Sequence, residues 1–167
     1  MSTADHKYAF DDMKESNPGY ITAFVQKANA YLENDIDDCW VEEVLDELLP
    51  KHPDNIDLLG VYVSLQGLAG MLCNTVDAYQ KICNAEPTFE NRFSLAEALV
   101  ESVEFDLFSL GSDTPKDIVI QTSKKSIQQS LMIIEELAKE TTDNNWRSLI
   151  DEIVERAHQI KSQLTVL

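Results

Sequence analysis

The sequence predicts an all-α fold: a right-handed array of about three helical hairpins with a C-terminal capping helix. Apolar residues recur at three- and four-residue spacing through most of the chain, the pattern of amphipathic helices. Two helical segments end at Pro53 and Pro87, 34 residues apart, and a further helical segment follows each. A period of that length is typical of stacked helix–turn–helix units. No segment is a convincing strand, since the nearest candidate, 118–122, lies just inside a helix start.

Composition excludes several classes of function. The net charge of -17 disfavours bare nucleic acid and anionic membranes as partners, because both repel an acidic protein. No run approaches the ~18 apolar residues of a membrane helix. The three cysteines, Cys39, Cys73 and Cys83, form no CxxC pair, so we expect buried thiols in a reducing compartment. The N-terminus lacks a basic start followed by an apolar core, which favours a cytoplasmic location.

The first 53 residues contain a tail and the first hairpin. Residues 1–19 are expected to form a tail or a short helix, ended by the breaker cluster at 17–19. The first repeat, about 20–53, pairs a helix over 20–33 with a second that is capped at Asp37 or Asp38 and ends at Leu49. The second helix carries its acids opposite its apolar stripe: Glu42, Glu43, Asp46 and Glu47.

The second repeat, about 54–87, begins with a helix capped by Asp54 or Asn55 and continues with a helix from Thr75. The first of these is apolar on two sides, as expected for an element packed between two neighbours. Its apolar residues are Ile56, Leu58, Leu59, Tyr62, Val63, Leu65 and Leu68.

The third repeat, about 88–140, is irregular. A helix from Thr88 or Phe89 precedes a connection over 106–114, which we expect to be mobile, and a long helix then runs from a cap at Thr114. The buried stripe expected for the long helix is Ile127, Leu131, Ile134 and Ala138, with Leu137 beside it. The capping helix, 144–165, follows a cap at Asp143 or Asn144 and aligns Trp146, Ile150, Ile153, Ala157, Ile160 and Leu164.

Residues of about 20–105 resemble the tetratricopeptide repeat (TPR) family. Tyr79, Lys81 and Pro87 fall where the second helix of that family carries an aromatic residue, a lysine and a terminal proline, and Leu45 replaces the aromatic residue one repeat earlier. The resemblance implies a single TPR-like domain over 20–167. It also implies a binding scaffold whose concave groove is lined by the first helix of each hairpin.

The 34-residue register assigns the partner-binding groove to nine positions. Small residues there either leave room for an inserted peptide or permit tight helix packing, and the sequence leaves both open. No lysine or arginine is among them, which disfavours acidic chaperone tails, while the acidic rim favours basic partners. The groove residues are Ala23, Gln26, Ala30, Asp57, Gly60, Ser64, Asn91, Ser94 and Ala98.

No pattern indicates catalysis, a cofactor or a metal site. The aspartates at 35, 37 and 38 lack the glycine and closing glutamate of a calcium loop, and His6, His52 and His158 have no second ligand at helical spacing. The sequence therefore predicts a non-catalytic protein-binding module, a small chaperone or adaptor that holds a protein or peptide. The alternatives are a secretion-type chaperone for an exported client and a structural subunit of a larger assembly.

Overall fold

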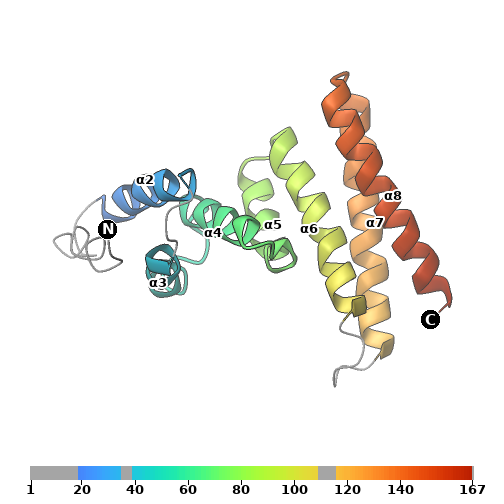
Figure 1. Ribbon diagram of the computed structural model, residues 1–167, viewed down its shortest axis with the longest axis horizontal. Coiled ribbons are helices and arrows are strands. Elements are labelled where there is room, and N and C mark those ends of the chain that lie inside the picture. Colours follow the sequence, from blue (N-terminus) through green and yellow to red (C-terminus); the bar gives the residue numbers. More distant parts are fainter. Residues whose placement is uncertain (1–18, 35–38, 109–115, 167) are drawn as a thin grey trace. The chain divides into compact units, whose positions relative to one another are not determined.

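A computed structural model describes residues 19–34, 39–108 and 116–166. These residues form seven α-helices and one short 3-10 helix and contain no strand, which confirms the all-α class (Figure 1). The chain divides into two compact units, Met1–Met71 and Leu72–Leu167. The boundary falls inside the second predicted repeat, between its two helices. The single domain and the right-handed array therefore stay predictions.

Unit 1 contains α2 (Tyr20–Leu32), α3 (Cys39–Leu48) and α4 (Ile56–Leu68), and α4 packs against both other helices. Asn55 caps α4, because its side-chain oxygen accepts a hydrogen bond from the backbone N–H of Leu58 at 3.0 Å. The predicted caps of α3 lie outside the described residues. Apolar side chains of all three helices form one core: Phe24, Ala28, Leu32, Trp40, Val41, Leu45, Leu48, Leu58, Val61 and Leu65.

Trp40 of α3 packs against aromatic side chains of α2. Its ring meets Phe24 and Tyr31 edge-on, with centroids 5.8 Å and 5.2 Å away. The ammonium of Lys27 lies 5.4 Å from the indole centroid, within the range of a cation–π interaction. Aromatic pairs in this geometry stabilise by about 0.5–1.5 kcal/mol beyond the area they bury. The apolar stripe of α2 is therefore already used within unit 1, and its opposite side faces outward.

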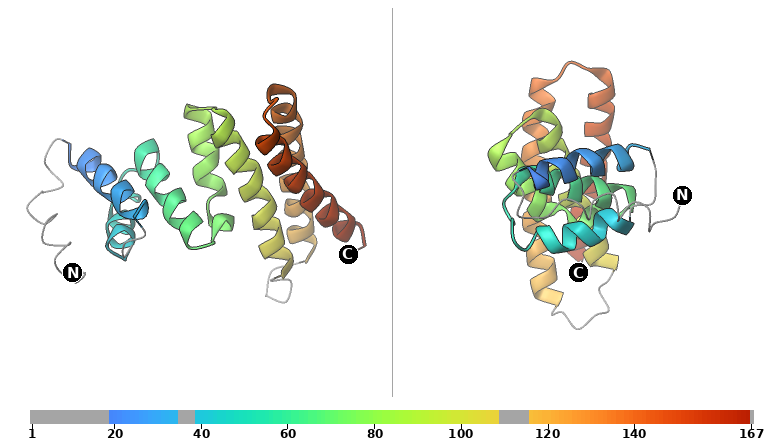
Figure 2. Two further views of the ribbon diagram at one scale, coloured as in Figure 1. Left: turned by 45° about the horizontal axis from the view of Figure 1, so that its top comes forward. Right: turned by 90° about the vertical axis from the view of Figure 1, so that its left-hand side faces the viewer.

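Unit 2 contains η1 (Leu72–Asn74), α5 (Val76–Ala85), α6 (Phe89–Phe108), α7 (Lys116–Glu140) and α8 (Asn144–Val166). α6 packs against η1, α5, α7 and α8, while α7 and α8 form a hairpin (Figure 2). Thr88 and Asp143 cap α6 and α8 through hydrogen bonds from the N–H groups of Asn91 and Asn145. The largest core combines α6, α7 and α8: Phe93, Ala96, Val100, Val103, Ile127, Ile134, Leu137, Ile150, Ile153, Ala157, Ile160 and Leu164.

Four sequence expectations need correction. α6 continues to Phe108, so residues 106–108 are helical rather than part of a mobile connection; 109–114 lie outside the described residues. Leu68, at the end of α4, is 58% exposed. Ala138 is exposed, because α7 packs on α6 and α8 with the adjacent Leu137 inward. Cys39 is exposed and Cys73 is partly exposed, so only Cys83 is a buried thiol. The start of a helix at Thr75 is confirmed, since Thr75 is the residue that precedes α5; its hydroxyl donates to the Leu72 carbonyl and makes no capping bond to α5.

Candidate binding faces

The predicted groove residues of unit 1 belong to α2 and α4, two helices in contact, and none of them is buried. Gln26, Ala30, Asp57 and Ser64 are exposed, and Ala23 and Gly60 are half-buried. A Cβ atom added at Gly60 would meet nothing within 4 Å, so the space beside this part of α4 is empty. The Ser64 hydroxyl donates to the Gly60 carbonyl at 3.0 Å, which holds that side chain against its own helix. We name these six positions the α2/α4 face; all of them are at least partly exposed to solvent.

The predicted groove residues of unit 2 are occupied by internal contacts. Asn91 donates from its side-chain amide to the Glu86 carbonyl at 2.9 Å. Ser94 and Tyr79 share a side-chain hydrogen bond; burial raises the pKa of Tyr79, and this bond opposes the rise. Ala98 is 0% exposed. The assignment of Ala98 to an open groove is therefore wrong, because neighbouring elements cover α6 on several sides.

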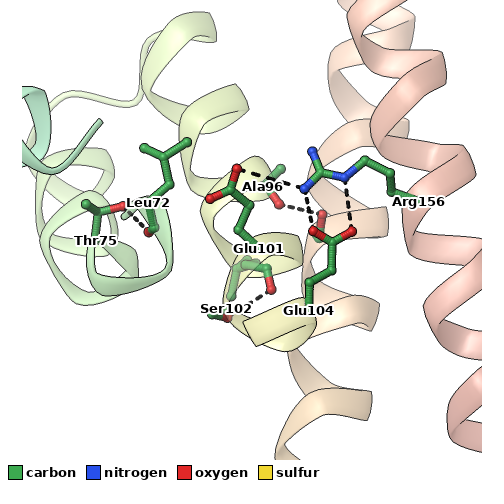
Figure 3. Close-up of polar contacts among 9 residues, drawn as sticks. Leu72, Thr75, Ala96, Glu101, Ser102, Glu104 and Arg156 are labelled. Atoms are coloured by element: carbon green, nitrogen blue, oxygen red, sulfur yellow. Dashed lines mark hydrogen bonds and ion pairs between the residues drawn. The ribbon is translucent and has the colours of Figure 1, made fainter. Parts of the chain in front are cut away.

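A cluster of carboxylates lies where α6 meets α8. Arg156 donates to both carboxylate oxygens of Glu104, at 3.1 Å and 2.7 Å, and its Nη2 lies 3.9 Å from Glu101 (Figure 3). Burial raises the pKa of Glu97, and the negative charge of Glu101 raises it further, while Arg156 lowers it. The bidentate pair joins the two helices, so we assign this cluster a structural role.

A second arginine joins α6 to the end of α7. Arg92 forms a bidentate pair with Glu140 at the surface, and one of its bonds, Nη1 to Oε1, is 2.9 Å long. This hydrogen bond lowers the pKa of Glu140. Exposed pairs of this kind contribute little to stability, because water and salt screen the two charges. The pair therefore fixes the position of the α7 end more than it stabilises unit 2.

A furrow that the sequence did not predict lies between α7 and α8. Its cavity volume is about 520 Å³, and every lining residue belongs to one of these two helices. Met132 lines the furrow from α7 and is 59% exposed. Lys124 of α7 and Lys161 of α8 also line the furrow. A sequence signal does exist, because no Asp or Glu occurs in 118–134 or in 156–166 of this acidic chain. Only the pairing of α7 with α8 brings the two stretches together.

Neither a metal site nor a membrane span is found in the part of the chain that the structure describes. Among those residues, no three His, Cys, Asp or Glu side chains are grouped so that they could hold a metal ion. No helix there combines the length and apolarity needed to cross a membrane. The four acids of α3, at positions 42, 43, 46 and 47, are all exposed.

No protein-family model matches the chain, and neither a curated protein nor a solved structure is significantly similar to it.

Proposed function

We propose that this protein is a non-catalytic binding module, a small chaperone or adaptor, that holds a partner segment on the α2/α4 face. One observation supports this: all six groove positions predicted in unit 1 lie outside its core, with empty space at Gly60. The core of unit 1 already uses the apolar sides of α2 and α4. A partner could therefore bind without unfolding any helix.

The chemistry of unit 1 favours a basic segment with small or apolar side chains. Asp57 lies on the α2/α4 face, and the exposed side of α3 adds four acids. Charge complementarity of this kind raises association rates and selects partners more than it raises affinity. Contacts with the small residues at positions 23, 30 and 60 would then supply the remaining affinity. A cytoplasmic protein or peptide of this composition is the partner we propose.

A structural subunit is the second candidate. Unit 2 exposes several large apolar side chains, among them Phe105 at 51%, Ile118 at 59% and Leu149 at 43%. Exposed apolar side chains that gather into a patch mark interaction surfaces in soluble proteins. A constitutive partner would cover them, whereas a chaperone would release its client. A secretion-type chaperone for an exported client is the sharper form of the first proposal.

The test is an affinity pull-down from native lysate with the full chain as bait and Gly60→Arg as the comparison bait. The arginine side chain would occupy the α2/α4 face and repel basic segments. We expect one basic protein to be captured by the wild-type chain and lost with Gly60→Arg. A stoichiometric complex captured equally by both baits would favour the subunit candidate instead.

A further inference from the structure

None of the other described helices lines the α7–α8 furrow. α6 packs against both helices, yet no residue of α6 lines the furrow. The α7–α8 pair is thus covered by α6 on one side and has a furrow elsewhere on its surface. In helical bundles, a groove between two helices is filled by the side-chain ridges of another helix. The volume of about 520 Å³ lies within the usual range of ligand sites.

The furrow combines an apolar floor with cationic edges. Ile127 and Leu164 are almost fully buried, and Leu131 is partly buried; together they form the floor between the two helices. Lys124 and Lys161 stand at its edges, and neither makes an ion pair with any described residue. Glu135 is the single acid among the lining residues. A ligand with apolar side chains on one stripe and carboxylates beside it would complement this surface.

The charges of the two helices separate along their length. α7 carries Lys124 and Lys125 but no acid over 118–134, and α8 carries Arg156 and Lys161 but no acid over 156–166. The chain as a whole holds 30 acids against 13 lysines and arginines. The furrow is therefore a local basic region on an acidic protein. Repulsion from distant acids is screened beyond about 8 Å at physiological salt, so the adjacent lysines dominate at contact.

We infer that the α7–α8 furrow binds an acidic amphipathic helix of a partner protein, with apolar residues at i, i+3, i+4 and i+7. This site goes beyond the proposed function, because it lies in unit 2 and prefers the opposite charge to the α2/α4 face. The apolar stripe of the partner helix covers Met132 and Leu131 of this chain. Carboxylates of the partner, on either side of its stripe, pair with Lys124 and Lys161. Helix-in-groove recognition uses the same spacing.

The test is a selection with a displayed library of helix-compatible peptides of about 18 residues, which as helices would be about 27 Å long. The immobilised bait is the full chain, and soluble chain carrying Lys124→Glu and Lys161→Glu is the competitor. We expect the enriched peptides to carry net negative charge and apolar residues at helical spacing. Their affinity should fall at least about tenfold with the double variant, because two attractive contacts become repulsive.

Three further variants test whether the selected peptides bind in the furrow. Lys139→Glu makes the same charge change on α7 outside the furrow and should alter affinity by no more than about twofold. Lys124→Gln with Lys161→Gln replaces the double variant if that one does not fold. Gly60→Arg should bind the selected peptides as the wild type does, so failure of the α2/α4 proposal would leave this result intact.

Several outcomes would overturn the inference. Enrichment of neutral or basic peptides would contradict the charge preference. Enrichment that does not depend on the two lysines would place the site elsewhere. Sedimentation showing a dimer that Met132→Glu dissociates would mean that a second copy of the chain occupies the furrow instead.

Discussion

The same repeat position is open in unit 1 and closed in unit 2. Ala30 and Ser64 are exposed, whereas Ala98, one further 34-residue period along, is fully buried. The cause is the number of neighbours, because α6 is covered by η1, α5, α7 and α8. A repeat register therefore locates equivalent backbone positions but does not determine their exposure. Small residues permit tight packing in unit 2 and leave space in unit 1.

The largest expected effect comes from Ala98→Arg. A long cationic side chain has no room at a fully buried position, and it would also carry an unpaired charge into the interior. We expect a loss of about 4 kcal/mol or more, enough to unfold unit 2. Gly60→Arg places the same side chain at a half-buried groove position of unit 1 and should be neutral or stabilise α4 by up to about 1 kcal/mol. Thermal melts followed by circular dichroism compare them, and equal melting curves would refute the open-versus-closed distinction.

Two buried serines of α7 should respond differently to replacement by alanine. Ser130 donates to the Ala96 carbonyl at 2.8 Å, so Ser130→Ala should cost about 1 kcal/mol of unfolding free energy. The Ser123 hydroxyl has no hydrogen-bond partner among the described residues and is equally buried, so Ser123→Ala should be neutral or stabilising. Urea denaturation of the two variants measures the difference. A larger loss for Ser123→Ala would contradict the hydrogen-bond assignment.

The smallest effect is a pH dependence from Glu97. Its pKa in the folded state lies above the ordinary value of 4.5, chiefly because of burial, so the folded state binds this proton more tightly than the unfolded chain does. The contribution of Glu97 to the free energy of unfolding is most favourable at pH values below 4.5, and it is lost as pH rises through the pKa of Glu97 in the folded state. Glu97→Gln should therefore raise stability relative to wild type at neutral pH, with a smaller difference near pH 4.5. Denaturation at neutral pH and near pH 4.5 measures the difference in stability between Glu97→Gln and wild type. A difference that grows toward low pH would contradict the predicted direction.

Elements were predictable from the sequence where one helix face decides burial. The α8 stripe from Ile150 to Leu164 is buried as its periodicity indicates, and the alternatives for the caps resolve to Asn55 and Asp143. Local spacing and capping chemistry contain that information. The burial of Ala98 and the lysine-edged furrow were not predictable from the sequence, because both depend on which helices, distant in sequence, pack against α6 and α7. The right-handed array stays a prediction for the same reason.

The most direct test of the binding proposal is the affinity of the captured partner for Gly60→Arg, measured by calorimetric titration. Gln121→Arg is the matched control, since it places the same side chain at an exposed position of α7. We predict that Gly60→Arg keeps its helical content and melting temperature but loses at least about tenfold in affinity. Gln121→Arg should bind as the wild type does. A folded Gly60→Arg variant that binds at wild-type affinity would contradict the assignment of the α2/α4 face.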